Sequence, residues 1–121
     1  MDTTDEIAVE DHRYFQARLA HLERQHPAAL LAHLEQGTLT QHLREIAERG
    51  MQAKAKLVFE RNMTPGQADE LVMNQVVADP AERSRLRDPE GRMKLRRLLD
   101  RYKAEMPNLP RTYQSQNETT E

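Results

Sequence analysis

The chain of 121 residues contains no cysteine and no tryptophan, and only 4% of its residues are aromatic. Because cysteine is absent, disulfide bonds, thiolate catalysis and cysteine-ligated zinc sites are excluded. The scarcity of aromatics removes the side chains that contribute most buried area to a core. Two interpretations follow: a small bundle built on Leu and Ala, or a bundle that buries part of its apolar surface in an oligomer or against a partner protein.

Long apolar runs are also missing from the chain. No stretch approaches the ~20 residues that a membrane-spanning helix needs. Residues 1–12 are acidic and lack the hydrophobic block of a secretory signal. We therefore expect a cytoplasmic protein that has no membrane partner.

Apolar residues recur at helical spacing, which predicts an all-α fold, a small helical bundle of about four to five helices. The longest unbroken pattern lies within 38–62 and predicts one long central helix. Its apolar face is formed by Leu39, Leu43, Ile46, Gly50, Ala53 and Leu57. The other helices are expected at 5–25, 27–36, 65–78 and 89–105, with at most a short helix at 80–87.

Capping residues indicate where several of these helices begin. Thr38 with Gln41, and Thr64 with Gln67, fit the Thr-x-x-Gln capping box. Asp88 precedes a proline, which suits the first position of the last helix. A single helical domain is expected over 1–106, followed by a polar, disordered tail at 107–121.

Gly50 and Ala53 lie one turn apart on the apolar face of the central helix. A glycine inside a helix costs up to about 1 kcal/mol relative to alanine, so Gly50 suggests a place where another helix crosses closely. The alternative is a helix break, but the apolar pattern keeps its phase across Gly50. We predict a helix-contact notch at Gly50 and Ala53. With the sparse core, it suggests a homo-oligomer, of which an intertwined dimer is one form.

Charge is divided unevenly along the chain. Residues 1–82 carry 8 basic and 14 acidic residues, whereas residues 83–111 carry 10 basic and 4 acidic residues. The basic block begins with Arg83, Arg85 and Arg87. In the last predicted helix it continues with Arg92, Lys94, Arg96, Arg97, Arg101 and Lys103. These last six residues are a candidate site for nucleic acid, whose phosphates they could follow, or for an acidic partner. The alternative is docking on the acidic face of residues 1–48, in the same chain or across a dimer.

No motif for catalysis, a cofactor or a metal emerges from the sequence. The five histidines are nine, five, seven and nine residues apart, whereas two ligands on one helix face need a spacing of three or four. The carboxylate pairs Glu45–Glu48 and Asp69–Glu70 lie beside basic residues on solvated helix faces. We therefore expect a non-enzymatic protein without a cofactor, a metal or a small-molecule substrate.

The segment 26–53 combines a proline, a Leu-rich helix, a Gly-x-Leu turn and a His-Leu helix. The residues that carry this pattern are Pro27, Leu30, Leu31, Leu34, Gly37, Leu39, His42, Leu43, Ile46 and Ala53. The pattern resembles the small transposon-encoded proteins of the TnpV family. The C-terminal half departs from that family, because the Trp- and Asn-containing helix is missing. The resemblance implies a setting in a mobile genetic element and supplies no catalytic residues.

Three functions follow, in order of preference. The first is a non-enzymatic accessory protein of a mobile genetic element that acts through protein–protein binding. The second is a nucleic-acid-binding accessory factor that uses the basic C-terminal helix. The third is a small inhibitor of a host or defence enzyme.

Overall fold

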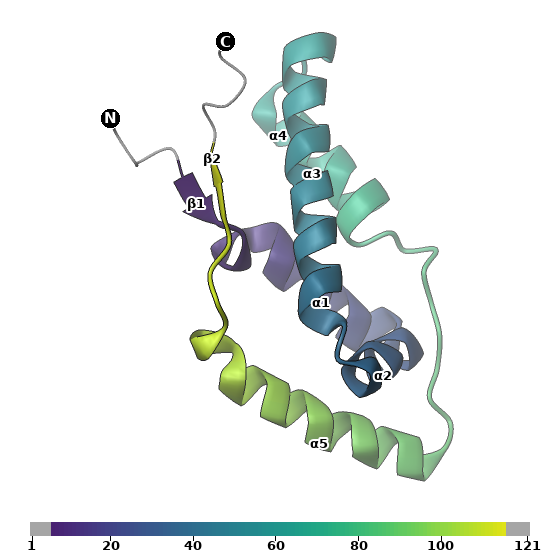
Figure 1. Ribbon diagram of the computed structural model, residues 1–121. Helices are drawn as coiled ribbons and strands as arrows, with labels where there is room; N and C mark the ends of the chain where they lie inside the picture. The colour runs from purple at the N-terminus through teal and green to yellow at the C-terminus, as the bar shows by residue number, and fades with distance from the viewer. Residues whose placement is uncertain (1–5, 116–121) are drawn as a thin grey trace.

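The computed structural model describes residues 6–115 and shows that this part of the chain is all-α, with five α-helices (Figure 1). They are α1 (Arg13–Gln25), α2 (Pro27–Gln36), α3 (Leu39–Arg61), α4 (Pro65–Val72) and α5 (Pro89–Glu105). Short helical turns lie before α1 at Val9–Asp11, after α4 at Met73–Val77 and after α5 at Met106–Asn108. The strands β1 (Glu6–Ala8) and β2 (Tyr113–Ser115) pair antiparallel, so the two ends of the described chain lie side by side. Within 6–115, no helix combines the length and apolar character that crossing a membrane requires.

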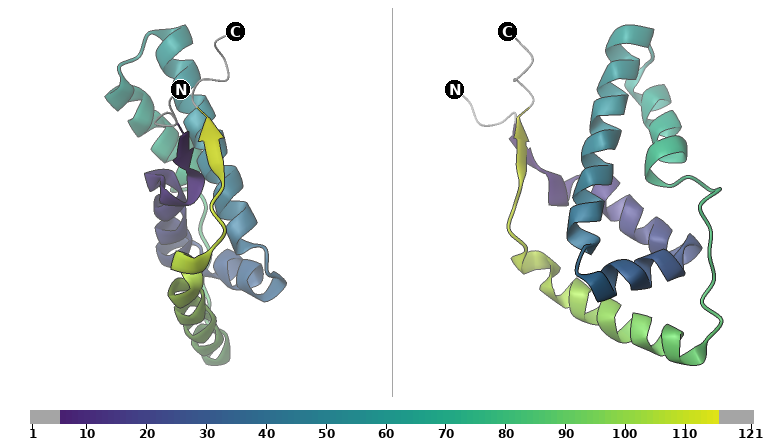
Figure 2. Two further views of the ribbon diagram at one scale, coloured as in Figure 1. Left: turned by 60° about the vertical axis from the view of Figure 1, so that its left-hand side comes forward. Right: turned by 45° about the vertical axis from the view of Figure 1, so that its right-hand side comes forward.

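The long helix α3 is central, as the sequence predicts. In Figures 1 and 2, α1 crosses α3 near its middle, while α4 and the turn after it lie along the second half of α3. Helices α2 and α5 pack together at the other end. The core is built mainly from Tyr14, Phe15, Leu19, Leu22, Leu30, Leu39, Leu43, Ile46, Ala47, Val72, Val77 and Leu99. The helical spacing of apolar residues on α3 therefore identified its buried face.

The predicted helix at 5–25 is wrong at its start, because α1 begins only at Arg13. His12 caps it, with Nδ1 accepting a hydrogen bond from the Tyr14 N–H at 3.0 Å. Glu10 is only 2% exposed, and its carboxylate accepts hydrogen bonds from Arg44 and from the Thr112 N–H. These bonds hold the N-terminal segment against the C-terminal segment, a pairing that a continuous helix would break.

The C-terminal segment lies against the rest of the chain as far as it is described. The Pro110 carbonyl accepts a hydrogen bond of 2.6 Å from Arg44 Nη2, and Arg111 pairs with Asp11 at 3.4 Å. The strand β2 continues this contact to residue 115. Secondary structure is thus present beyond residue 106, at Met106–Asn108 and Tyr113–Ser115, and residues 116–121 of the predicted tail lie outside the described residues.

Helix starts were predicted with mixed success. At Thr64 the capping box is confirmed, with reciprocal hydrogen bonds of 3.1 Å between Thr64 and Gln67. At Thr38 the capping box is wrong, although α3 does begin there. The Thr38 hydroxyl hydrogen-bonds to His33 Nδ1 at 2.7 Å and makes no capping hydrogen bond to α3. The last helix has the predicted bounds, with Asp88 as its N-cap.

Candidate functional site

The predicted notch on α3 is a real close contact, and it is filled from within the same chain. A Cβ atom added at Gly50 would lie 2.9 Å from Tyr14 Cδ2 and 3.2 Å from Val77 Cγ2. Helix α3 is continuous across this position. Ala53 packs at the edge of the core. The notch is thus occupied by α1 and by the turn after α4 of the same chain, and not by a second chain as a homo-oligomer contact would require.

The basic residues of α5 divide into two groups, and the first bonds within the chain. Lys94 Nζ lies 2.5 Å from Glu35 of α2, and Lys103 Nζ lies 3.1 Å from Glu23 of α1. Arg92 Nη1 donates hydrogen bonds of 3.1 and 2.8 Å to the carbonyls of Leu86 and Arg87. For the two lysines, docking on the acidic N-terminal half is therefore the arrangement that the structure shows.

The second group on α5 comprises Arg96, Arg97 and Arg101. All three are exposed, and none forms an ion pair or a hydrogen bond with another residue of the described chain. The predicted row of six basic residues thus leaves three that are open to an external anion.

Three further arginines lie on the segment that leads into α5. The predicted short helix at 80–87 is absent, and residues 82–87 are extended. Burial alternates along them: Glu82, Ser84 and Leu86 are partly buried, whereas the intervening arginines are exposed. Since successive side chains of an extended chain point to opposite sides, these arginines share one outward side. We refer to Arg83, Arg85 and Arg87 as the arginine strip.

The inward side of this segment is anchored to α1 by an ion pair. Arg18, only 4% exposed, donates to both carboxylate oxygens of Glu82 at 2.5 and 3.3 Å. The same guanidinium donates to the Val77 carbonyl at 3.0 Å and to His42 Nε2 at 3.1 Å. The hydrogen bond from Arg18 lowers the pKa of Glu82 and outweighs the opposing effect of burial. Glu82 is therefore ionised at neutral pH and holds the segment in place.

Ser84 provides a second anchor, at the junction of α1 and α2. Its N–H donates to the Gln25 carbonyl at 3.0 Å, and its Oγ accepts from the Ala28 N–H at 3.0 Å. The hydroxyl also shares a hydrogen bond of 2.6 Å with His26 Nδ1. Two anchors only two residues apart explain why the segment is extended, because a helix could not direct both side chains inward.

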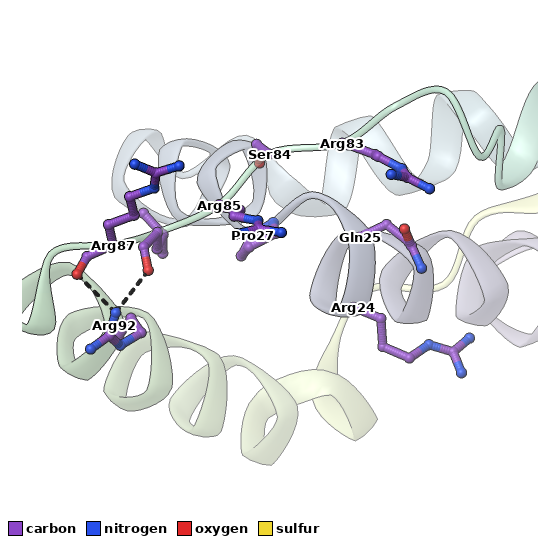
Figure 3. Close-up of a pocket in the computed structure, with 9 residues that line it drawn as sticks. Arg24, Gln25, Pro27, Arg83, Ser84, Arg85, Arg87 and Arg92 are labelled. Atoms are coloured by element: carbon purple, nitrogen blue, oxygen red, sulfur yellow. Dashed lines mark hydrogen bonds between the residues drawn. The ribbon is translucent and has the colours of Figure 1, made fainter.

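A hollow of about 580 Å³ lies between this segment, the α1–α2 junction and α5 (Figure 3). It is lined by Arg24, Gln25, Pro27, Arg83, Ser84, Arg85, Leu86, Arg87 and Arg92. Five of these nine residues are arginines from three parts of the chain, and none is acidic or aromatic. We call it the first hollow. Figure 3 shows Arg83, Arg85 and Arg87 along the segment, Arg24 on α1 and Arg92 on α5, an arrangement that suits an extended anion better than a compact one.

The five histidines serve local packing and hydrogen bonding. His12 caps α1, His26 holds Ser84, and the rings of His33 and His42 stack with centroids 4.4 Å apart. His21 is buried, and burial together with the Arg18 charge lowers its pKa. Among residues 6–115, no group of three or more His, Asp or Glu side chains could hold a metal ion.

The sequence counted the arginine strip in the basic block but did not place it in the candidate site. Its signal was available, because arginines at 83, 85 and 87 have the period of two that marks an extended chain. Arg24 gave no such signal, since only the fold brings it to the first hollow.

Comparison of the chain with protein-family models, with curated proteins and with solved structures finds no match. The resemblance of residues 26–53 to the TnpV family therefore stays a prediction.

Proposed function

We propose that this protein is a non-enzymatic accessory factor that binds nucleic acid through its phosphate backbone. The observation that carries the proposal is the alternating burial of residues 82–87. It fixes one side of the segment by Glu82 and Ser84 and directs the arginine strip outward. Alternate residues of an extended chain are about 7 Å apart, a spacing comparable to that of successive phosphates along an extended strand.

The exposed arginines of α5 add further basic charge to the strip. Arg96, Arg97 and Arg101 follow the strip in sequence and have no carboxylate partner among residues 6–115. One guanidinium group can donate two hydrogen bonds to the oxygens of one phosphate. Each phosphate that is neutralised releases counterions, which makes binding dependent on salt. The surface lacks aromatic side chains for stacking and offers charge in a fixed geometry, so binding is expected to depend strongly on salt and weakly on base sequence.

Fluorescence anisotropy with labelled DNA at about 50 and 200 mM salt tests this proposal. The triple variant Arg83→Gln/Arg85→Gln/Arg87→Gln should lose affinity by on the order of tenfold or more at low salt, with a shallower salt dependence. The matched control is Arg49→Gln/Lys56→Gln/Arg61→Gln, which removes the same charge from exposed positions of α3. Equal losses in the two variants, or no binding of the parent protein at low salt, would refute the proposal.

The prediction of a mobile-element accessory protein that binds another protein is a second candidate. One observation favours it: Phe59, on the last turns of α3, is 82% exposed, more than any other large apolar side chain that the structure describes. A homo-oligomer that covers Phe59 should appear as a mass above 14.1 kDa in light scattering. The variant Phe59→Ser should then return it to the monomer mass, and a monomer at all concentrations would remove self-association as the explanation.

A further inference from the structure

A second hollow adjoins the first hollow along α5. Its volume is about 320 Å³, within the lower range of ligand pockets in proteins. It is lined by Glu23, Pro27, Leu86, Leu95, Leu99, Arg92, Arg96, Asp100 and Lys103. Three of these residues, Pro27, Leu86 and Arg92, also line the first hollow. The two hollows are therefore neighbouring parts of one groove, which begins at the arginine strip and continues along α5.

The two hollows differ in chemistry. The first has five arginines and no acid. The second has an apolar surface of Pro27, Leu86, Leu95 and Leu99, and its charged lining is mixed, with two carboxylates and the basic residues Arg92, Arg96 and Lys103. Glu23 is paired with Lys103 at 3.1 Å, whereas Asp100 pairs with no other described residue. A phosphate is thus favoured more strongly in the first hollow, where no carboxylate opposes it, and an uncharged, flat, partly apolar group fits the second hollow better.

We propose that the groove binds an unpaired nucleotide of a single strand, with its phosphate in the first hollow and its base in the second. The proposal rests on the proposed function and specifies the form of nucleic acid. A base has an apolar face for Leu86, Leu95 and Pro27, and polar edges that the carboxylates and Arg96 at the rim can meet. Arg92 lies between the two hollows, where the sugar and phosphate join.

A duplex cannot use this groove in the same way. Its bases are stacked and paired, so a base reaches a side pocket only after it has been unpaired, which costs a few kcal/mol. A single strand presents its bases without that cost. The duplex would contact the arginine strip alone, and the apolar hollow would stay empty. If the second hollow binds a base, the protein should bind single strands more tightly than duplexes. Binding by the strip alone should not distinguish the two.

The test compares three labelled ligands of equal length by anisotropy at low salt: a single strand, its duplex, and a single strand with abasic residues. We expect the single strand to bind about five- to tenfold more tightly than the abasic strand, which has the same phosphates. The variant Leu95→Asn should lose this difference and keep its affinity for the duplex. Leu57→Asn is the matched control, because Leu57 is a partly buried leucine on α3, away from the groove.

The outcomes separate the two proposals. Equal binding of normal and abasic single strands overturns the base site and leaves phosphate binding by the strip intact. Absence of binding to all three ligands overturns both. If Leu95→Asn does not fold, as judged by its circular dichroism melt, the comparison of normal with abasic strands on the parent protein decides the question alone.

Discussion

The notch on α3 and the arginine strip are both sequence features that call for a contact, but the structure treats them differently. Gly50 finds its contacts inside the chain, in the ring of Tyr14 and the side chain of Val77. The arginines of the strip have no acidic partner within residues 6–115. The residues between and before them, Ser84 and Glu82, are bonded to the α1–α2 junction and to Arg18. The fold itself fills the notch, whereas the exposed arginines keep their charge open to an external anion, as the proposed function requires.

Anchoring the segment that carries the strip costs conformational entropy on folding and fixes the arginines before a ligand binds. Ordering an extended segment loses about 1–2 kcal/mol of backbone entropy per residue, which the ion pair of Glu82 with the buried Arg18 and the bonds to Ser84 offset. Because this ordering takes place on folding, a ligand that binds the arginines does not have to supply it again. The following predictions compare the notch, which the fold fills, with the strip, whose arginines have no acidic partner in the described chain. They begin with the largest expected effect.

Filling the notch should be the most damaging change. Gly50→Leu would place side-chain atoms where the Tyr14 ring and Val77 already lie, and we expect it to lower the free energy of unfolding by about 3 kcal/mol or more. Urea denaturation measures this change. The control is Gly66→Leu in α4, because a Cβ there meets nothing within 4 Å. Equal stability of Gly50→Leu and the parent protein would contradict a closed notch.

Removing the buried anchor should weaken both fold and binding. Arg18→Met leaves Glu82 without its ion-pair partner and two further acceptors, the Val77 carbonyl and His42, without a donor. We expect a loss of about 2–4 kcal/mol in the free energy of unfolding and weaker DNA binding, since the strip is no longer held. Arg13→Met is the control: Arg13 pairs with Asp69 at the surface, where an ion pair contributes about 1 kcal/mol or less. Unchanged affinity in a folded Arg18→Met would show that the anchor does not position the strip.

Local patterns predicted what depends on neighbours in sequence. The bounds of α5 followed from Asp88 and the prolines at both ends, and the continuity of α3 followed from its apolar phase. The start of α1 was wrong because Glu10 bonds to Arg44 and Thr112, which are 34 and 102 residues away. The same reason explains the segment at 80–87, whose conformation is set by distant partners. Of the candidate site, the basic charge was visible in the sequence, but the division of α5 into paired and unpaired residues required the fold.

Lowering the pH should reduce the free energy of unfolding through His42, which accepts a hydrogen bond from Arg18. Burial, together with the nearby Arg18 charge, lowers the pKa of His42 from 6.5 to about 4. Between these values the unfolded state binds the proton more readily, so the free energy of unfolding falls as pH decreases from about 6.5 to 4. We expect a loss of about 1–2 kcal/mol between pH 7 and pH 5, measured by urea denaturation.

The matched variant for this pH dependence is His42→Gln, which keeps an acceptor for Arg18 and cannot titrate. It should lose less stability than the parent protein over the same pH range. His12, His21 and His33 also have lowered pKa values, with burial as the main cause, so the variant retains part of the dependence. Identical pH profiles of variant and parent would exclude His42 as a contributor.

The smallest effects should come from removing single charges on α5. They compare a basic residue that is paired within the chain with one that is not. Lys94 is paired with Glu35 and lines neither hollow, so Lys94→Gln should cost at most about 1 kcal/mol of stability and change DNA affinity little. Arg97 pairs with no other described residue, so Arg97→Gln should leave stability unchanged and reduce the salt slope of DNA binding by about 1. The two variants remove the same charge from the same helix, so measuring both quantities in each separates intrachain pairing from ligand binding. If Lys94→Gln weakened DNA binding as much as Arg97→Gln, net charge rather than the unpaired arginines of α5 would govern affinity.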